Sequence, residues 1–340
     1  MASTSARNPY DLSGLPDDRS DCFPRILLDT DMMTDCDDCL ALGLLHRLAD
    51  LGEAEILGVM VSSRHPDSAL TVDRINTYYG RGDLPLARPC DGSGYTTDKS
   101  CFISQVREAF PGQYASIDQV PDAVTMSRRI LSAQPHRSVT LVTIGYQSNL
   151  ADLLKSAADE VSPLAGPDLV RRKVAAWVCM GGNFPVDDAQ ANVNFTRDPE
   201  AAYFTLTHWP APVVFVGREI GHRIYTGDFL KAADESNPVR MAYRLHRGRG
   251  GPDASWDHHT ADPCTILYAV RGAGNYWSVC SRGGIDLKPD CSFEWKAEIE
   301  SDQAYLKQVM SRSRVAEIIV RIMQSSSPCR SRAGEGTGAP

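Results

Sequence analysis

Five carboxylates lie within ten residues, in the run Asp29-Thr-Asp31-Met-Met-Thr-Asp35-Cys-Asp37-Asp38. Like charges packed this densely repel one another unless a cation or hydrogen bonds hold them. A hard cation with oxygen ligands is the most direct solution. Capping of the following helix accounts for one or two of these residues, because a helix N-terminus favours anions, but it does not account for five. The run therefore predicts a metal site.

Two other acidic motifs compete for this run. An EF-hand loop needs acids at alternate positions, a central glycine and a closing Glu; the run departs from it at two positions and has Leu40 at the last, which excludes that motif. An aspartate-nucleophile phosphotransferase also begins with D-x-D after a buried strand. Asp29 would then attack phosphate and Asp31 would act as acid and base, with Mg²⁺ between them. That hypothesis leaves the Asp37-Asp38 pair and the later motifs without a role.

The third hypothesis rests on a family resemblance. Asp29-Thr-Asp31, Asp37-Asp38 and Leu40-Ala-Leu42 resemble the N-terminal signature of the inosine–uridine-preferring nucleoside hydrolases. In that family these carboxylates share one Ca²⁺ and the sugar, which implies Asp31 and Asp38 as metal ligands and Asp37 as a sugar ligand. The common family form has three residues between the two acidic pairs and this chain has five, so the resemblance leaves open whether Asp35 or Asp37 binds the sugar.

Two later segments resemble the family in the same order. Leu141-Val-Thr-Ile144-Gly145 is similar to the turn whose residue before the glycine gives its backbone carbonyl to Ca²⁺, which implies Ile144, although alone it is an ordinary strand-to-helix turn. Met180-Gly-Gly-Asn183, Asn192-Val-Asn194 and Asp198-Pro-Glu-Ala-Ala resemble the family's M-G-G, E-F-N and D-P-E-A-A segments. The resemblance implies substrate-binding roles for Asn194, for Asn192 in place of the usual Glu, and for Asn183.

A late segment supplies the last implied metal ligand. Asp262-Pro263, at the start of a predicted helix, resembles the motif whose carboxylate completes the Ca²⁺ site, and Asp257 is a second, less favoured candidate. The His that precedes this motif in the family, and protonates the leaving base in some members, is Ala261 here. Either His258 and His259 replace it as catalytic residues or they are solvated loop histidines.

The matched segments together imply a nucleoside hydrolase fold and Ca²⁺-dependent hydrolysis of the N-glycosidic bond of ribonucleosides, of the kind used in purine and pyrimidine salvage. Asp31 would be the base that activates water for an oxocarbenium-like transition state. His65, after the second predicted strand, either contacts the substrate or caps the next helix. The alternatives are a related metal-dependent hydrolase of a modified nucleoside or other glycoside, and a binding protein that keeps the metal without turnover.

The elements that must position these residues follow from the hydrophobic pattern. Expected strands are Arg25–Asp29, Ile56–Val61, Val139–Ile144, Lys173–Met180 and Pro212–Val216. Expected helices are Asp38–Leu51, Ser68–Tyr79, Ser148–Ala158, Asp198–Thr207, Pro263–Arg271 and Ala304–Met323. This alternation is typical of βαβ units, so we expect an α/β, Rossmann-like fold with a mostly parallel central sheet and flanking helices. Ligands bind beyond the carboxyl ends of such strands, where most of the motifs lie.

The domain boundaries follow from changes in composition. Residues 1–24 are polar and punctuated by Pro and Gly, which predicts a flexible N-terminal arm. Residues 25–324 are expected to form one domain, and the low-complexity residues 325–340 a disordered tail. Residues 85–135 are loop-rich and would form either an insertion or a cover over the site.

Composition limits the class of protein. The chain has 340 residues, of which 42% are hydrophobic, and its net charge is −8. A large core is therefore available, and the acidic balance argues against nucleic acid as a partner. No apolar run reaches the roughly 18–20 residues that cross a bilayer, and no apolar signal core begins the chain. We expect a cytoplasmic protein with a small nucleoside substrate, and analogy with the family implies a homodimer or homotetramer.

The ten cysteines are scattered along the chain, which argues against a disulfide framework. Only Cys36 and Cys39 have C-x-x-C spacing. A redox pair or half of a zinc site would fit that spacing, but no second C-x-x-C supplies two further ligands. Two ordinary thiols near the start of a helix are therefore the preferred interpretation.

Overall fold

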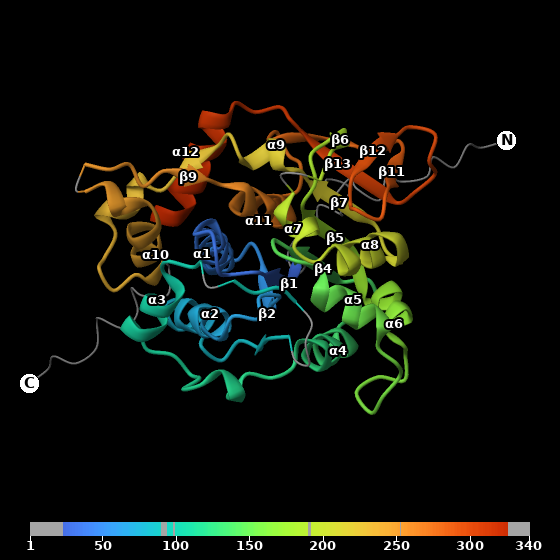
Figure 1. Ribbon diagram of the computed structural model, residues 1–340, viewed down its shortest axis with the longest axis horizontal. Helices are drawn as coiled ribbons and strands as arrows, with labels where there is room; N and C mark the ends of the chain where they lie inside the picture. Colours follow the sequence, from blue (N-terminus) through green and yellow to red (C-terminus); the bar gives the residue numbers. More distant parts are fainter. Residues whose placement is uncertain (1–22, 90–93, 98, 190–191, 252, 326–340) are drawn as a thin grey trace, which may run out of the picture.

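A mostly parallel sheet forms the centre of the computed structural model, which describes residues 23–89, 94–97, 99–189, 192–251 and 253–325 (Figure 1). Every pair of neighbouring strands in this sheet is parallel except the β10–β13 pair at one edge. The eight strands lie in the order β10 (Trp277–Cys280), β13 (Gln303–Gln308), β7 (Val213–Val216), β5 (Val174–Met180), β4 (Val139–Thr143), β1 (Arg25–Thr30), β2 (Glu55–Val61) and β3 (Leu86–Ala87). The predicted α/β class is confirmed.

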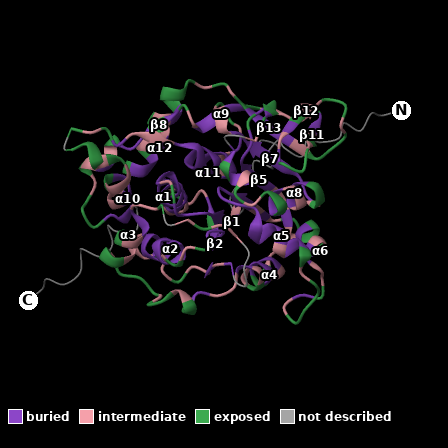
Figure 2. Cartoon of the chain, in the orientation of Figure 1, coloured by how far each residue is buried: buried purple, intermediate pink, exposed green. Residues whose placement is uncertain are grey.

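Helices cover both faces of the sheet. Successive strand residues point to opposite sides, and the residues on both sides are apolar and need to be buried. In β1, Ile26 and Leu28 belong to one apolar core and Leu27 to the other. The first core contains side chains of α1 (Asp37–Asp50), α2 (Pro66–Tyr78), α11 (Ala261–Arg271) and α12 (Arg312–Gln324). The second contains side chains of α4 (Ala123–Ala133), α5 (Ser148–Lys155), α6 (Gly166–Lys173) and α8 (Pro199–His208). Figure 2 shows the buried residues concentrated on the sheet and the inner helix faces.

Shorter elements surround this layered centre. They are the helices α3 (Ile103–Ala109), α7 (Val193–Thr196), α9 (Arg218–Gly221) and α10 (Pro238–Arg247), and the 3₁₀ turns η2 (Ile117–Gln119), η3 (Asp228–Ala232) and η4 (Gly248–Gly250). A three-stranded sheet consists of β11 (Gly284–Leu287), β12 (Phe293–Lys296) and β6 (Val186–Asp187). A two-stranded sheet pairs β8 (Tyr225–Thr226) with β9 (His258–His259). Among the described residues, no helix is both long and apolar enough to cross a membrane.

The strand order places the acidic run at a switch point of the sheet. β1 pairs with β2 on one side and with β4 on the other, so the later strands of the sheet lie on both sides of β1. Crevices that bind ligands form at such points, beyond the carboxyl ends of the strands. Gly145, after β4, makes this packing close, since a Cβ there would lie 2.4 Å from the backbone nitrogen of Asp31.

The expected strands and most of the expected helices agree with the structure to within a few residues, but the helix predicted over Ala304–Met323 is wrong at its start. Residues Gln303–Gln308 form β13, which pairs in parallel with β7, and α12 begins only at Arg312. The short apolar run of residues 304–306 fits a strand as well as a helical turn, and its pairing with the sheet decides the matter.

Four further expectations are refined by the structure or fall outside the described residues. The helix expected over Ser148–Ala158 ends at Lys155, and α6 follows it. The loop-rich residues 85–135 contain β3, α3, η2 and α4, and α4 covers the second face of the sheet. The predicted arm 1–24 and tail 325–340 lie outside the described residues, apart from positions 23, 24 and 325.

His46, in the middle of α1, makes stability depend on pH. Its side chain is fully buried, its Nε2 donates to Asn76 Oδ1 over 2.9 Å, and its ring stacks on Tyr79. Burial lowers the pKa of His46 to about 3. The unfolded chain therefore takes up a proton below about pH 6.5 that the folded protein refuses until about pH 3, so acid favours unfolding in that window.

We expect His46→Gln, which keeps a donor for Asn76, to flatten this dependence. Between pH 7 and pH 5, His46 should cost the wild type about 2 kcal/mol of unfolding free energy, at about 1.4 kcal/mol per pKa unit crossed below pH 6.5. The variant should be spared that loss when both proteins are unfolded with urea at the two pH values. Equal losses in the two proteins would contradict the assignment.

Candidate active site

Asp29 is a buried carboxylate that ties strands together. It is 2% exposed, and its Oδ2 accepts a 2.8 Å hydrogen bond from Asn149 Nδ2, which also donates to the Val61 carbonyl over 2.9 Å. Burial raises the pKa of Asp29 to about 8. Asn149 therefore joins the ends of β1 and β2 to α5, and Asp29 is too buried to meet a phosphate as the phosphotransferase hypothesis requires.

Three buried carboxylates meet at the N-termini of α1 and α11. One oxygen each from Asp37, Asp38 and Asp262, called the carboxylate cluster below, lies within 4.8 Å of the others. Thr30 Oγ1 donates to Asp38, and the backbone nitrogen of Asp262 donates to Asp37 Oδ2 over 3.4 Å. Burial, and then the charges of the neighbouring carboxylates, raise the pKa of Asp38 and of Asp262 well above the ordinary value.

Asp31 lies beside the carboxylate cluster at the end of β1. It is 9% exposed, and burial followed by the charges of Asp37 and Asp35 raises its pKa to about 7, against a hydrogen bond from Tyr146 that lowers it. Tyr146 follows β4, and its backbone nitrogen donates to Ser62 Oγ, after β2, over 3.2 Å. A cation beside these carboxylates would stabilise the ionised form of Asp31 and lower its pKa again.

Asn194 connects α7 to the same end of the sheet. Its Nδ2 donates to the carbonyl oxygens of Ile144 and Met180, each over 3.1 Å. These carbonyls end β4 and β5, so the amide fixes both strand ends. A carbonyl oxygen has two lone pairs, and the bond from Asn194 leaves Ile144 one for another partner.

Asp35 turns away from the carboxylate cluster toward three imidazoles. His258 Nε2 lies against its Oδ1, His259 Nε2 is 3.0 Å from its Oδ2, and His246 Nε2 is 3.7 Å from its Oδ1. These four residues are called the histidine cluster below. Burial alone would raise the pKa of Asp35, but its contacts with His258 and His259 hold it well below the usual range. Of Asp35 and Asp37, the two candidates for binding the sugar, only Asp37 therefore lies in the carboxylate cluster.

His259 bridges the two clusters. Its Nε2 faces Asp35 and its Nδ1 is 3.2 Å from Asp37 Oδ2, while its ring stacks on His222 with centroids 4.2 Å apart. Burial lowers the pKa of His259, but the two carboxylates outweigh it and raise the pKa to about 10. Burial lowers the pKa of His222 to about 3, so the stacked partner stays neutral.

Packing between α9 and α11 holds Asp262 in place. A Cβ on Gly221 would lie 2.3 Å from Ala261 Cα and 2.7 Å from the Thr260 carbonyl, so the two backbones can approach only because residue 221 is glycine. The backbone nitrogen of Thr260 donates to the Gly221 carbonyl over 3.2 Å. Ala261, where the family usually has His, is 2% exposed in this contact.

The remaining residues singled out from the sequence make contacts of their own. His65 is the N-cap of α2 and accepts from the Asp67 backbone nitrogen over 3.1 Å, which fits its capping alternative. Asn183 is exposed and donates to the Val186 carbonyl within its own loop. Asn192 is buried and donates to Asp187, and Asp257 accepts from the Asp228 backbone nitrogen over 3.0 Å.

Three residues of this region were not predicted. Tyr146 bonds Asp31, His246 faces Asp35, and Asp187 receives the amide of Asn192. Tyr146 could have been found, because it follows the predicted third strand at the edge where ligands bind. His246 and Asp187 lie on a helix and a short strand whose positions depend on tertiary packing, and no local pattern marks them.

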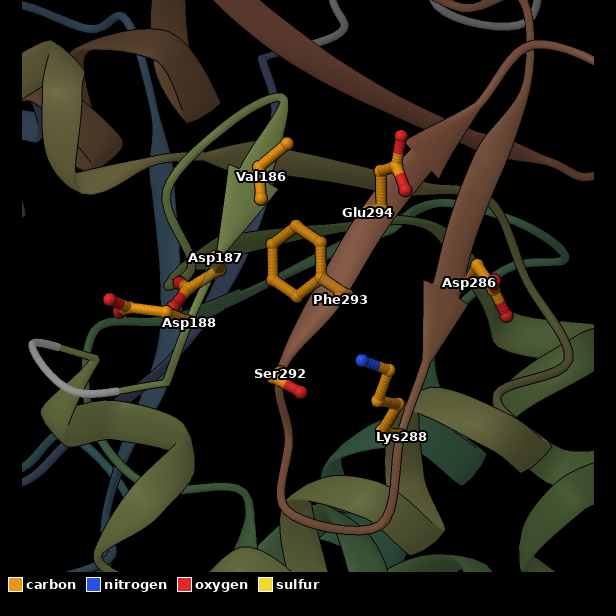
Figure 3. A pocket seen from close by; sticks show the side chains of 8 residues that line it. All are labelled: Val186, Asp187, Asp188, Asp286, Lys288, Ser292, Phe293 and Glu294. Carbon is orange, nitrogen blue, oxygen red and sulfur yellow. The ribbon is translucent and has the colours of Figure 1, made fainter.

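A surface pocket of about 350 Å³ lies beside β6, β11 and β12 (Figure 3). Four carboxylates and one amine line it, so it is poorly suited to an anion. Asp187 is at its wall, and the bond from Asn192 connects this wall to the segment that carries Asn194. The lining residues are Val186, Asp187, Asp188, Asp286, Lys288, Ser292, Phe293 and Glu294.

The carboxylate cluster fits a hard cation. Its donors are all oxygens, and their mutual repulsion in a buried site is relieved by a positive ion. Asp31 and the Ile144 carbonyl belong to loops at the same end of the sheet. The chemistry of this donor set suits Ca²⁺ or a similar ion, and the geometry does not choose among such ions.

Comparison with known proteins decides the family. A family model described as inosine-uridine preferring nucleoside hydrolase matches residues 26–322. The chain belongs to this family. No curated protein gives a significant match.

Solved structures agree with the nucleoside hydrolase fold. A plant nucleoside hydrolase is 20% identical with a TM-score of 0.67, and the match covers 89% of this chain and 99% of that one. The inosine-uridine preferring nucleoside hydrolase from Bacillus anthracis is 15% identical with a TM-score of 0.65, over 89% and 99% of the chains. The type III effector protein XopQ, complexed with adenosine diphosphate ribose, is 18% identical with a TM-score of 0.64, over 90% and 95%. At these identities the likeness shows the fold alone.

We expect Ca²⁺ to stabilise the wild type and to have little effect on Asp262→Asn. At 100 times its dissociation constant, a bound ligand adds about 2.7 kcal/mol to the unfolding free energy. In chelator the variant should be at least as stable as the wild type, because one of the repelling charges is gone. Urea unfolding with chelator and with excess Ca²⁺ measures both effects.

Asp257→Asn is the matched control, since Asp257 lies outside the carboxylate cluster, and it should gain as much from Ca²⁺ as the wild type does. An equal gain in Asp262→Asn would remove Asp262 from the set of ligands.

Proposed function

We propose that this protein hydrolyses the N-glycosidic bond of ribonucleosides in a Ca²⁺-dependent reaction that yields free base and ribose. The observation that carries the proposal is the position of Asp31 next to the carboxylate cluster, at the switch point of a sheet with the nucleoside hydrolase fold. Membership of the family supports the same reaction class.

In this proposal Asp31, Asp38, Asp262 and the Ile144 carbonyl hold Ca²⁺. When bound, the ion supplies charge for the sugar hydroxyls and lowers the pKa of a nearby water. Thr30 orients Asp38 through its hydroxyl hydrogen bond, and the packing of α9 on α11 orients Asp262.

Asp31 is the proposed general base. It would take a proton from the attacking water as positive charge develops on the sugar. The Tyr146 hydroxyl holds the Asp31 carboxylate in one orientation by its hydrogen bond. Asp37 and the amide oxygen of Asn194 are proposed to accept hydrogen bonds from the ribose hydroxyls and so fix the sugar for attack.

Protonation of the leaving base is proposed for His258 or His259. Ala261 has no proton to give, and these are the nearest histidines along the chain. Both ring nitrogens of His259 face carboxylates, and Nε2 of His258 lies against Asp35. His259 must therefore leave one of its carboxylates before it can donate to a base, whereas the contact of His258 with Asp35 involves Nε2 and not Nδ1.

A second candidate function is hydrolysis of a modified nucleoside or another glycoside on the same fold. Asn192 stands where the family usually has a carboxylate. Its buried amide nitrogen donates to Asp187, so this donor is occupied within the protein. Together with Ala261, this contact favours a substrate that differs from the common nucleosides. A bound but unreacted sugar would instead indicate a binding protein. By analogy with the family we also propose a homo-oligomer.

We expect ribose release from at least one member of a panel of purine and pyrimidine ribonucleosides, and a chelator should abolish it. Asp31→Asn should lower kcat by about two to four orders of magnitude, the usual contribution of a general base. Reducing-sugar assays on both proteins measure this. Asp257→Asn should keep the wild-type rate, and turnover that survives both the chelator and Asp31→Asn would refute the proposal.

The role of the histidines can be tested with two leaving groups. We expect His258→Gln or His259→Gln to lower kcat on the best ribonucleoside and to leave the hydrolysis of p-nitrophenyl riboside nearly unchanged, because p-nitrophenolate departs without a proton. Equal losses on the two substrates would mean that the histidines position the site instead of donating a proton.

A further inference from the structure

A donor group that shares Asp35, His246 and His258 with the histidine cluster, and adds Cys36, differs from the carboxylate cluster. Asp35, Cys36, His246 and His258 each offer one atom, and these four atoms lie within 4.8 Å of one another. They come from three separate segments: the loop before α1, the last turn of α10, and β9. Two imidazole nitrogens, a thiol and a carboxylate form a donor set for a borderline metal ion, not for Ca²⁺.

Two imidazoles converge on one carboxylate oxygen. His246 Nε2 is 3.7 Å from Asp35 Oδ1, which is too long for a hydrogen bond. Ligand atoms of a tetrahedral zinc ion with bonds of about 2.0 Å lie about 3.3 Å apart. The distance between His246 Nε2 and Asp35 Oδ1 is therefore close to the distance between two ligand atoms in such a site. The Nε2 of His258 is fully buried and, although it touches the same oxygen, makes no hydrogen bond of normal geometry.

The sulfur of the set comes from Cys36 and not from the other cysteine of the C-x-x-C pair. Cys36 is fully buried at the N-cap of α1, next to Asp35 in the chain. Cys39 Sγ lies 3.3 Å from Met32 Sδ instead. The other ring nitrogen of His246, Nδ1, lies 3.5 Å from Cys101 Sγ. A partner on the second nitrogen fixes the ring orientation of a metal-binding histidine.

We infer that Asp35, Cys36, His246 and His258 form a second metal site, which takes a tetrahedral divalent ion of the zinc class. Binding displaces the thiol proton of Cys36, so one proton is released for each ion bound. The ion ties α10 and β9 to the loop that begins α1. The inference does not rest on the proposed nucleoside hydrolysis, and an ion held by His258 would leave His259 as the proton donor to the leaving base.

Cobalt tests the site, because Co²⁺ replaces zinc and absorbs visible light. The full-length protein is stripped of metal, saturated with Ca²⁺ to fill oxygen sites, and titrated with Co²⁺. We expect one equivalent to bind, with the absorption of tetrahedral cobalt and a thiolate-to-cobalt charge-transfer band. Cys36→Ser should lose the charge-transfer band, and His246→Gln and His258→Gln should each weaken binding by at least about 10-fold.

Matched controls separate this site from its neighbours. Cys39→Ser, His222→Gln and Asp262→Asn should bind Co²⁺ as the wild type does, and His246→Gln should keep its stabilisation by Ca²⁺, which shows that it is folded. Three outcomes would overturn the inference: no stoichiometric Co²⁺ binding, a spectrum without the thiolate band in the wild type, or binding that resists the loss of His246. Binding that depends on His259 and not on His246 would place the ion between Asp35 and Asp37 instead.

Discussion

Repulsion between buried carboxylates is the constraint on which this site depends. Asp31, Asp37, Asp38 and Asp262 are each at most 9% exposed, and their charges act on one another in a medium that screens them poorly. Such an arrangement costs free energy unless positive charge is supplied. The chain meets part of this cost with the N-termini of α1 and α11, whose dipoles favour anions, and with His259 between Asp35 and Asp37. A cation would supply the remainder.

Amide and hydroxyl side chains hold this charged region to the sheet. Asn149 links Asp29 to the end of β2, Asn194 links the ends of β4 and β5, and Thr30 bonds Asp38. Each of these bonds joins backbone or carboxylate groups that belong to different strands or helices. The geometry of the site is therefore fixed by the two packed layers that hold the strand ends, and local loop conformation contributes less.

The sequence was informative where a motif coincides with an element end. The family resemblance located the D-x-D pair, Ile144 and Asp262, and each lies at or next to the end of a predicted strand or the start of a predicted helix. The mostly parallel sheet follows from the alternation of these elements. Prediction failed where packing decides the outcome. Residues 304–306 join the sheet beside β7, although their pattern also fits a helix, and His246 reaches Asp35 only through the path of α10. The C-x-x-C spacing of Cys36 predicts further zinc ligands in a second C-x-x-C, whereas the histidines near Cys36 lie over 200 residues further along the chain.

The close contact of Gly221 with Ala261 has a consequence for how this chain could change. Position 221 tolerates only glycine, because a Cβ there would lie 2.3 Å from Ala261 Cα and would force α9 to retreat from α11. Such a retreat would also displace Asp262. A substitution at position 221 would therefore disturb the carboxylate cluster from outside it, without removing any of its carboxylates.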